Sequence, residues 1–220
     1  MHFSVIMRVT GILLMLFSIT LALPVMTRGA ATPDGGLTAR DRWARRGHHL
    51  AACAMAASFV VEWRGSVGGG YLLRALLAWG LLLGAGELWR PPGRSGWNRW
   101  LIWWAGWLTP AGLALVVLWP AQRVAALHLT FIGGFALLAL GVATQVSLGH
   151  QGYEQLKNGR PWPLALLVLG LAGALAARLA LAGADERFYL YLGVAAASLL
   201  AGVAVWAGFL LPKLWRPFGS

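Results

Sequence analysis

Residues 128–152 read HLTFIGGFALLALGVATQVSLGHQG, an apolar stretch of membrane-spanning length with one histidine at its start and another near its end. Polar side chains crowd its last turns, at Thr144, Gln145 and Ser147. A helix that only fills lipid would not carry these groups, because a buried polar atom without a partner costs free energy. The stretch therefore predicts a membrane helix whose uncharged histidines indicate metal or haem chemistry more than proton transfer through carboxylates.

The composition of the 220-residue chain is that of a membrane protein. Hydrophobic residues make up 59% of it and charged residues 11%, and the mean hydropathy is +0.67. A soluble domain of this length could not bury so much apolar surface, so we expect the lipid bilayer to surround the chain. The formal charge of +11 does not indicate nucleic acid, because the basic residues stand at the ends of apolar runs. The single Cys53 excludes an intrachain disulfide.

Apolar runs long enough, or nearly so, to cross a hydrocarbon core of about 30 Å recur along the whole chain. They lie near residues 5–26, 48–63, 70–89, 97–119, 123–148, 163–182 and 188–211. We therefore predict an all-α, multi-pass membrane helical bundle of about seven helices, forming a single transmembrane domain over residues 1–220. Pro110 falls inside the fourth run and predicts a kink there.

The first run has two interpretations. Arg8, an apolar stretch and Gly29-Ala30-Ala31 are typical of a secretory signal peptide with a small-residue cleavage site. The apolar stretch is long for a signal core, which favours a retained helix. Basic residues concentrate in 28–46, 90–99, 157–160 and 213–216, which fall on one side of a seven-helix chain. That side is predicted to be cytoplasmic, with the N-terminus outside and the C-terminus inside.

The positions of the histidines limit which of them can act together. At about 100° and 1.5 Å per residue, His128 and His150 share a face of an ideal helix but lie on opposite sides of the membrane. They therefore cannot bind one iron together. His48 and His49 are secondary candidates for metal ligands. The alternatives stay open: histidines at helix ends are often interfacial or capping residues, and His150 has the sequence context of a loop residue that bonds local carbonyls.

Other features have structural interpretations. The tryptophans of residues 97–107 have helical spacing, and we interpret them as an interfacial belt and packing residues rather than a cofactor pocket. Glycines are expected to permit close helix approach at Gly80, Gly84, Gly133, Gly134 and Gly141. We expect neither a discontinuous helix pair nor an intramembrane ion pair that would mark a midplane site, which argues against a small-molecule transporter. No residue stands out as a catalytic acid, base or nucleophile, so enzymatic activity is left open.

Residues 125–152 resemble the signature of a known family, the NnrS proteins. These are polytopic bacterial membrane proteins that bind haem and copper and act in the response to nitric oxide. The resemblance implies that His128 and His150 are haem or metal ligands, with Thr144, Gln145 and Ser147 around them. Gln145 stands where the family usually has arginine, so a haem-propionate contact from that cation is not implied.

Weaker similarity covers residues 23–28, 97–120 and the final helix, and so nearly the whole chain. The match is to the C-terminal half of a typical family member only, without its N-terminal tryptophan-histidine-x-histidine-glutamate motif. The resemblance thus implies a retained first helix, the bacterial inner membrane, and a second membrane polypeptide that supplies the missing half and further ligands. The alternative is a non-redox structural or assembly subunit that holds a partner membrane protein and binds no cofactor.

Overall fold

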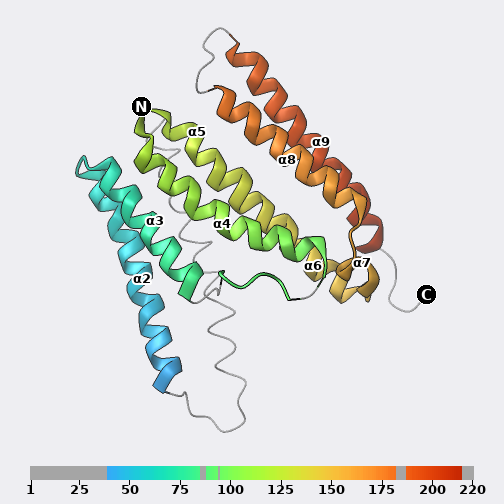
Figure 1. Cartoon of the computed structure of the whole chain (residues 1–220), viewed down its shortest axis with the longest axis horizontal. Helices are drawn as coiled ribbons and strands as arrows, with labels where there is room; N and C mark the ends of the chain where they lie inside the picture. Colours follow the sequence, from blue (N-terminus) through green and yellow to red (C-terminus); the bar gives the residue numbers. More distant parts are fainter. Residues whose placement is uncertain (1–38, 85–87, 94, 182–186, 215–220) are drawn as a thin grey trace. The chain divides into compact units, whose positions relative to one another are not determined.

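The computed structural model describes residues 39–84, 88–93, 95–181 and 187–214, and every regular element among them is helical (Figure 1). The helices are α2 (Ala39–Trp63), α3 (Val67–Gly84), α4 (Trp97–Leu118), η1 (Pro120–Gln122), α5 (Arg123–His128), η2 (Leu129–Ala136), α6 (Leu137–His150), α7 (Glu154–Asn158), α8 (Trp162–Ala180) and α9 (Phe188–Leu214). The chain divides into two compact units, and the division falls within α3, between Leu77 and Ala78.

Five helices are long and apolar enough to cross a membrane, which confirms the last five predicted runs as helices. They are Val67–Gly84, Trp97–Leu118, Pro120–His150, Trp162–Ala180 and Phe188–Leu214. The predicted run 5–26 lies outside the described residues. The run 48–63 belongs to α2, whose apolar part, His49–Trp63, is shorter than a span. Seven spans and an N-out orientation stay predictions.

The distribution of polarity is that of a protein in lipid. Large apolar side chains are exposed along the helices, among them Leu118 (78% exposed), Leu169 (65%) and Leu200 (67%). Polar side chains are instead buried at Ser58, Arg74, Asn98, Thr130 and Thr144. Large apolar side chains exposed along several helices are unusual for a protein in water, so the described helices have a surface suited to hydrocarbon.

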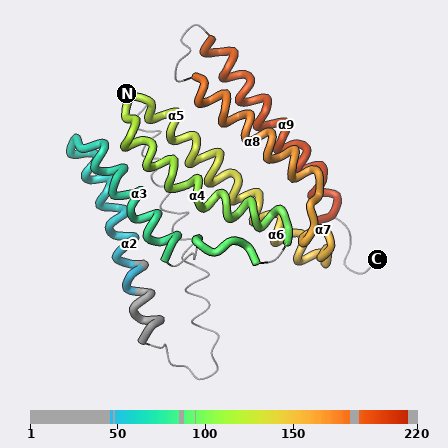
Figure 2. Tube along the Cα trace, in the orientation of Figure 1, coloured from blue at the N-terminus to red at the C-terminus, as the bar shows by residue number. Residues whose placement is uncertain are grey.

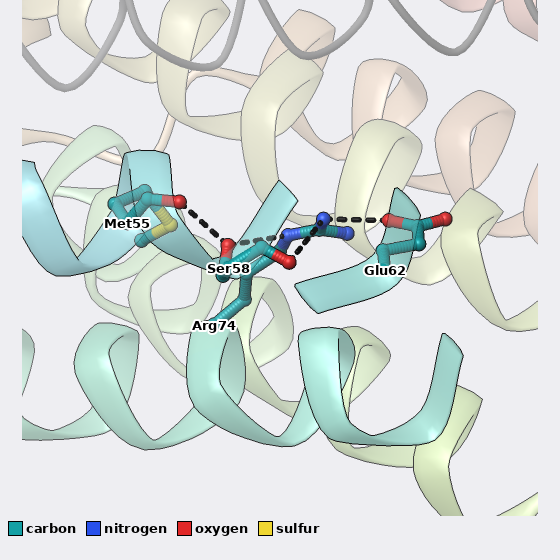
Figure 3. Close-up of polar contacts among 4 residues, drawn as sticks. All are labelled: Met55, Ser58, Glu62 and Arg74. Carbon is teal, nitrogen blue, oxygen red and sulfur yellow. Dashed lines mark hydrogen bonds and ion pairs between the residues drawn. The ribbon is translucent and has the colours of Figure 1, made fainter. Parts of the chain in front are cut away.

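In the first unit, α2 and α3 form a hairpin held by a buried ion pair (Figure 3). The Arg74 guanidinium donates from Nη2 to Glu62 Oε2 at 2.6 Å and from Nε to Ser58 Oγ at 2.9 Å. It also lies 3.8 Å from the centroid of the Phe59 ring and 4.7 Å from that of Tyr71. Arg74 is 3% exposed, so its charge is neutralised inside the hairpin rather than in solvent.

The expectation of no intramembrane ion pair is therefore wrong. Arg74 lies about 10 Å along α3 from its first residue, inside the apolar segment. Glu62 stands near the end of α2, twelve positions before Arg74, and the sequence did not indicate that the two side chains meet. The hairpin brings them together because Gly70 lets the helices approach: a Cβ there would lie 2.8 Å from Ser58 O. Arg74 is consequently not a cation that marks one side of the membrane.

In the second unit, α4 packs against α5, η2 and α6, while α8 packs along α9 and also contacts α5 and η2. Figures 1 and 2 show α8 and α9 side by side over most of their length. The core lies where these helices meet and consists of Leu101, Ala105, Leu137, Leu164, Leu167 and Leu171. α7 is a short helix in the connection between α6 and α8.

Glycines permit the closest approaches, as predicted at Gly133, Gly134 and Gly141. A Cβ on Gly134 would lie 3.0 Å from Thr109 Cα, and one on Gly141 would lie 3.0 Å from Ile102 Cγ1. At Gly80 and Gly84 an added Cβ would meet no atom within 4 Å, so no close approach occurs there among the residues that the structure describes. A glycine in a membrane helix thus marks a close contact only where a neighbouring helix crosses it.

Candidate functional site

His128 is the last residue of α5, and its imidazole has a defined orientation. Nδ1 lies 2.6 Å from the carbonyl oxygen of Val124, one turn earlier. A carbonyl oxygen only accepts, so Nδ1 carries the proton and, in the neutral ring, Nε2 keeps its lone pair. The side chain is half-buried. This is the tautomer and the arrangement by which a histidine binds iron or copper through Nε2.

A π-helical segment, η2, begins directly after His128 and continues to Ala136. Its turns lie against α4, where Thr130 Oγ1 donates to Thr109 O at 3.1 Å, immediately before Pro110. π-helical turns hold more residues than α-helical turns and occur frequently at functional sites. The ideal-helix geometry that put His128 and His150 on one face therefore does not apply across η2. Their separation along the helix remains, since they stand at the end of α5 and the end of α6.

Of the other predicted histidines, His150 belongs to the same unit as His128 and stands at the end of the following helix. His150 ends α6 and is exposed, next to the turn in which Gly152 takes a φ of 73°. His49 is exposed on α2, in the first unit. The His48 side chain lies outside the described part of the structure. Within the residues that the structure describes, no three side chains of His, Cys, Asp or Glu gather as a metal site.

The polar residues of the signature bond to neighbouring helices. Thr144 is fully buried, donates to Leu140 O at 2.7 Å and accepts from Trp206 Nε1 of α9 at 2.8 Å. Gln145 Oε1 accepts a hydrogen bond from Asn98 Nδ2 of α4. Both side chains, predicted to surround a cofactor, thus link α6 to α9 and to α4. Ser147 is half-buried on the same helix.

The Thr144–Trp206 bond gives a stability prediction. We expect Thr144→Val and Trp206→Phe to couple by about 0.5–1.5 kcal/mol in a double-mutant cycle, because each change removes one partner of the same buried bond. The free energies of unfolding would be measured in mixed micelles. As a control, Trp104→Phe, at an exposed tryptophan, should show no coupling with Thr144→Val. Additive effects of Thr144→Val and Trp206→Phe would contradict the bond.

The tryptophans of α4 lie on two different faces of the helix. Trp103 donates from Nε1 to Leu88 O at 2.8 Å, and Trp107 packs edge-on against Trp79 with centroids 5.3 Å apart. Trp97, Trp100 and Trp104 instead line a groove that α4 forms with α8. The packing interpretation holds for the first group. The second group lines the groove, and the helical spacing of the tryptophans in the sequence did not predict that groove.

Sequence reasoning missed three residues that surround the signature helix. Asn98 and Trp206 are the partners of Gln145 and Thr144, and Arg178 of α8 lies within electrostatic range of the His128 ring. Asn98 is the only amide side chain in the run 97–119, which is a signal that could have been used. Trp206 and Arg178 carried no such signal, because only the packing of α8 and α9 brings them to α5 and α6.

The comparison with protein families decides the identity of the chain. A sequence model described as NnrS protein matches residues 2–217, which include α2 to α9 and both histidines of the signature. The chain belongs to the NnrS family. Neither the comparison with curated proteins nor the comparison with solved structures gave a match. For this member of the NnrS family, membership and five apolar helices together establish a membrane protein.

Proposed function

We propose that this NnrS protein binds haem, and copper as a second group, in the bacterial inner membrane, and acts in the response to nitric oxide. The observation that carries the proposal is the His128 imidazole, oriented by Val124 O so that Nε2 is the ligating atom. Family membership over residues 2–217 supports the same conclusion. His150 is the second proposed ligand, in a separate site at the far end of the helix.

The residues around His128 fit a haem with one protein ligand. A single axial histidine is sufficient to hold haem iron, and His128 is half-buried, so its ring is accessible. The Arg178 guanidinium on α8 is close enough to influence the ring electrostatically and would stabilise an anionic propionate. A copper site with several ligands would draw the others from outside the described residues or from a second membrane polypeptide.

The cofactor and the protein chain would supply different parts of the chemistry. Bound haem supplies an iron that binds a diatomic ligand or passes an electron. The chain holds the imidazole in one tautomer through Val124 O. Thr144 and Gln145 fix α6 against α9 and α4, so the helix that carries both histidines is held in place.

The test is a reduced-minus-oxidised difference spectrum of the purified full chain from haem-replete cells. We expect haem bands in the wild type, a loss of about tenfold or more in His128→Ala, and partial recovery with added imidazole, which replaces the missing ligand. Copper per chain should fall in His150→Ala. Wild-type protein without haem bands would overturn the proposal.

His49→Ala is the matched control, because it removes an exposed histidine from the other unit. Its haem content should equal that of the wild type. If His49→Ala loses the bands and His128→Ala keeps them, the ligand lies on α2 and the assignment of His128 is wrong.

A second candidate function is a structural or assembly subunit that binds no cofactor. One observation favours it: Thr144 and Gln145, the polar residues of the signature, bond to α9 and α4 and not to a histidine. This candidate expects full function and co-purification of a partner after both His128 and His150 are replaced.

A further inference from the structure

A groove of about 520 Å³ opens between α4 and α8 in the second unit. Its apolar wall comes from Trp100, Leu101 and Trp104 of α4 and from Val168 and Leu169 of α8. Trp104 is 52% exposed and Leu169 is 65% exposed, so the groove is open along its side. Both helices have the length and hydropathy of membrane spans, so the medium beside the groove is lipid hydrocarbon.

One end of the groove is polar and lies where the spans begin. Ser95, Gly96 and Arg160 border it there, and Trp97 N–H donates to Gly159 O at 3.2 Å, which holds the start of α4 level with the turn before α8. From Trp97 to Trp104 the groove then follows α4 for about 10 Å. Its polar end therefore lies at the level of lipid head groups and its apolar part at the level of acyl chains.

The charge at the polar end is positive. Arg160 is exposed and borders the groove. The neighbouring carboxylate, Glu154, is engaged by Lys157 and Asn158, and the hydrogen bond from Lys157 lowers the pKa of Glu154. Arg99 donates to Ser95 O at 2.6 Å. Among the residues that the structure describes, Arg160 is the cation that lines the groove, and its planar guanidinium donors match a phosphate.

We propose that this groove is a binding site for an anionic phospholipid. Arg160 binds the phosphate, and one acyl chain lies along Trp100, Trp104 and Leu169. The combination of an apolar channel and a cation at its head-group end fits an anionic lipid better than a neutral one, and basic pockets between membrane helices bind such head groups. This inference is independent of haem or copper binding.

The test is native mass spectrometry of the full chain with added phosphatidylglycerol or phosphatidylethanolamine of identical acyl chains. The wild type should retain phosphatidylglycerol preferentially, and Arg160→Gln should lower that preference about fivefold, the effect of one basic residue near a head group. Arg187→Gln is the matched control, because it removes an exposed arginine that does not line the groove. Equal retention of both lipids by the wild type, or an unchanged preference in Arg160→Gln, would overturn the proposal.

A second pair of variants tests the acyl-chain part. Ala165 lines the groove, so Ala165→Phe should fill it and lower retention of phosphatidylglycerol. Ala176→Phe places the same side chain at an exposed position of α8 outside the groove and should leave retention unchanged. Unchanged retention in Ala165→Phe would place the lipid elsewhere. A co-purified neutral amphiphile that phosphatidylglycerol does not displace would equally contradict the proposal.

Discussion

Replacement of Glu62 by alanine should lower the free energy of unfolding by about 3–5 kcal/mol, because it leaves the Arg74 charge buried without its carboxylate. The loss should fall toward the lower end of that range, since Ser58 and the Phe59 and Tyr71 rings still contact the guanidinium. The measurement is the unfolding midpoint of the purified chain in mixed micelles.

The double variant Glu62→Gln with Arg74→Met should recover most of this loss, because it removes both charges together. Arg64→Gln is the matched control, since Arg64 is exposed in the turn after α2, and we expect a change within about 0.5 kcal/mol. If Glu62→Ala costs no more than Arg64→Gln, the ion pair does not stabilise the hairpin.

The second large effect is expected at Gly112, where α4 crosses α5 and η2. An added Cβ would lie 2.6 Å from Thr130 N and 3.0 Å from Ala126 O, and backbone atoms cannot rotate away. We therefore expect Gly112→Ala to cost about 1–3 kcal/mol, as overpacked cores do. Because Thr130 belongs to η2, the displaced turn should also lower the haem content that we propose depends on His128.

Gly80→Ala is the control for Gly112→Ala. A Cβ on Gly80 would meet no described atom within 4 Å, and alanine is the better helix former, so stability should stay equal or rise slightly. The two substitutions are chemically identical and differ only in what the new methyl group meets. Equal effects at both positions would contradict the close approach of α4 to η2.

The sequence alone predicted the five described membrane-spanning helices and the family. Apolar runs fixed the five described spans to within a few residues, because lipid requires nearly continuous apolar segments of a set length. It also indicated the close contacts at Gly133, Gly134 and Gly141. The ligand roles of His128 and His150 stay predictions, with a tautomer at His128 that supports one of them.

The features that the sequence did not indicate all depend on contacts between helices. The Arg74–Glu62 pair forms only once α2 and α3 lie together at Gly70. Likewise, the π turns of η2 have the composition of an ordinary apolar helix. The two surfaces of the α4 tryptophans differ because Leu88 and Trp79 cover one of them and α8 borders the other. The pattern of apolar residues in the sequence predicts which residues avoid water, but it does not predict which side chains of other helices they contact.

The π segment η2 also affects how this helix tolerates changes in length. A π turn is equivalent to an α-helix that has gained a residue, so one deletion within Leu129–Ala136 would restore α-helical geometry. Because the π turn already absorbs the additional residue, the segments on either side of it would keep nearly the same relative direction. The relative direction of His128 and His150 should therefore survive the loss of a single codon within η2. The same loss within α6 would instead turn the residues that follow it by about 100°.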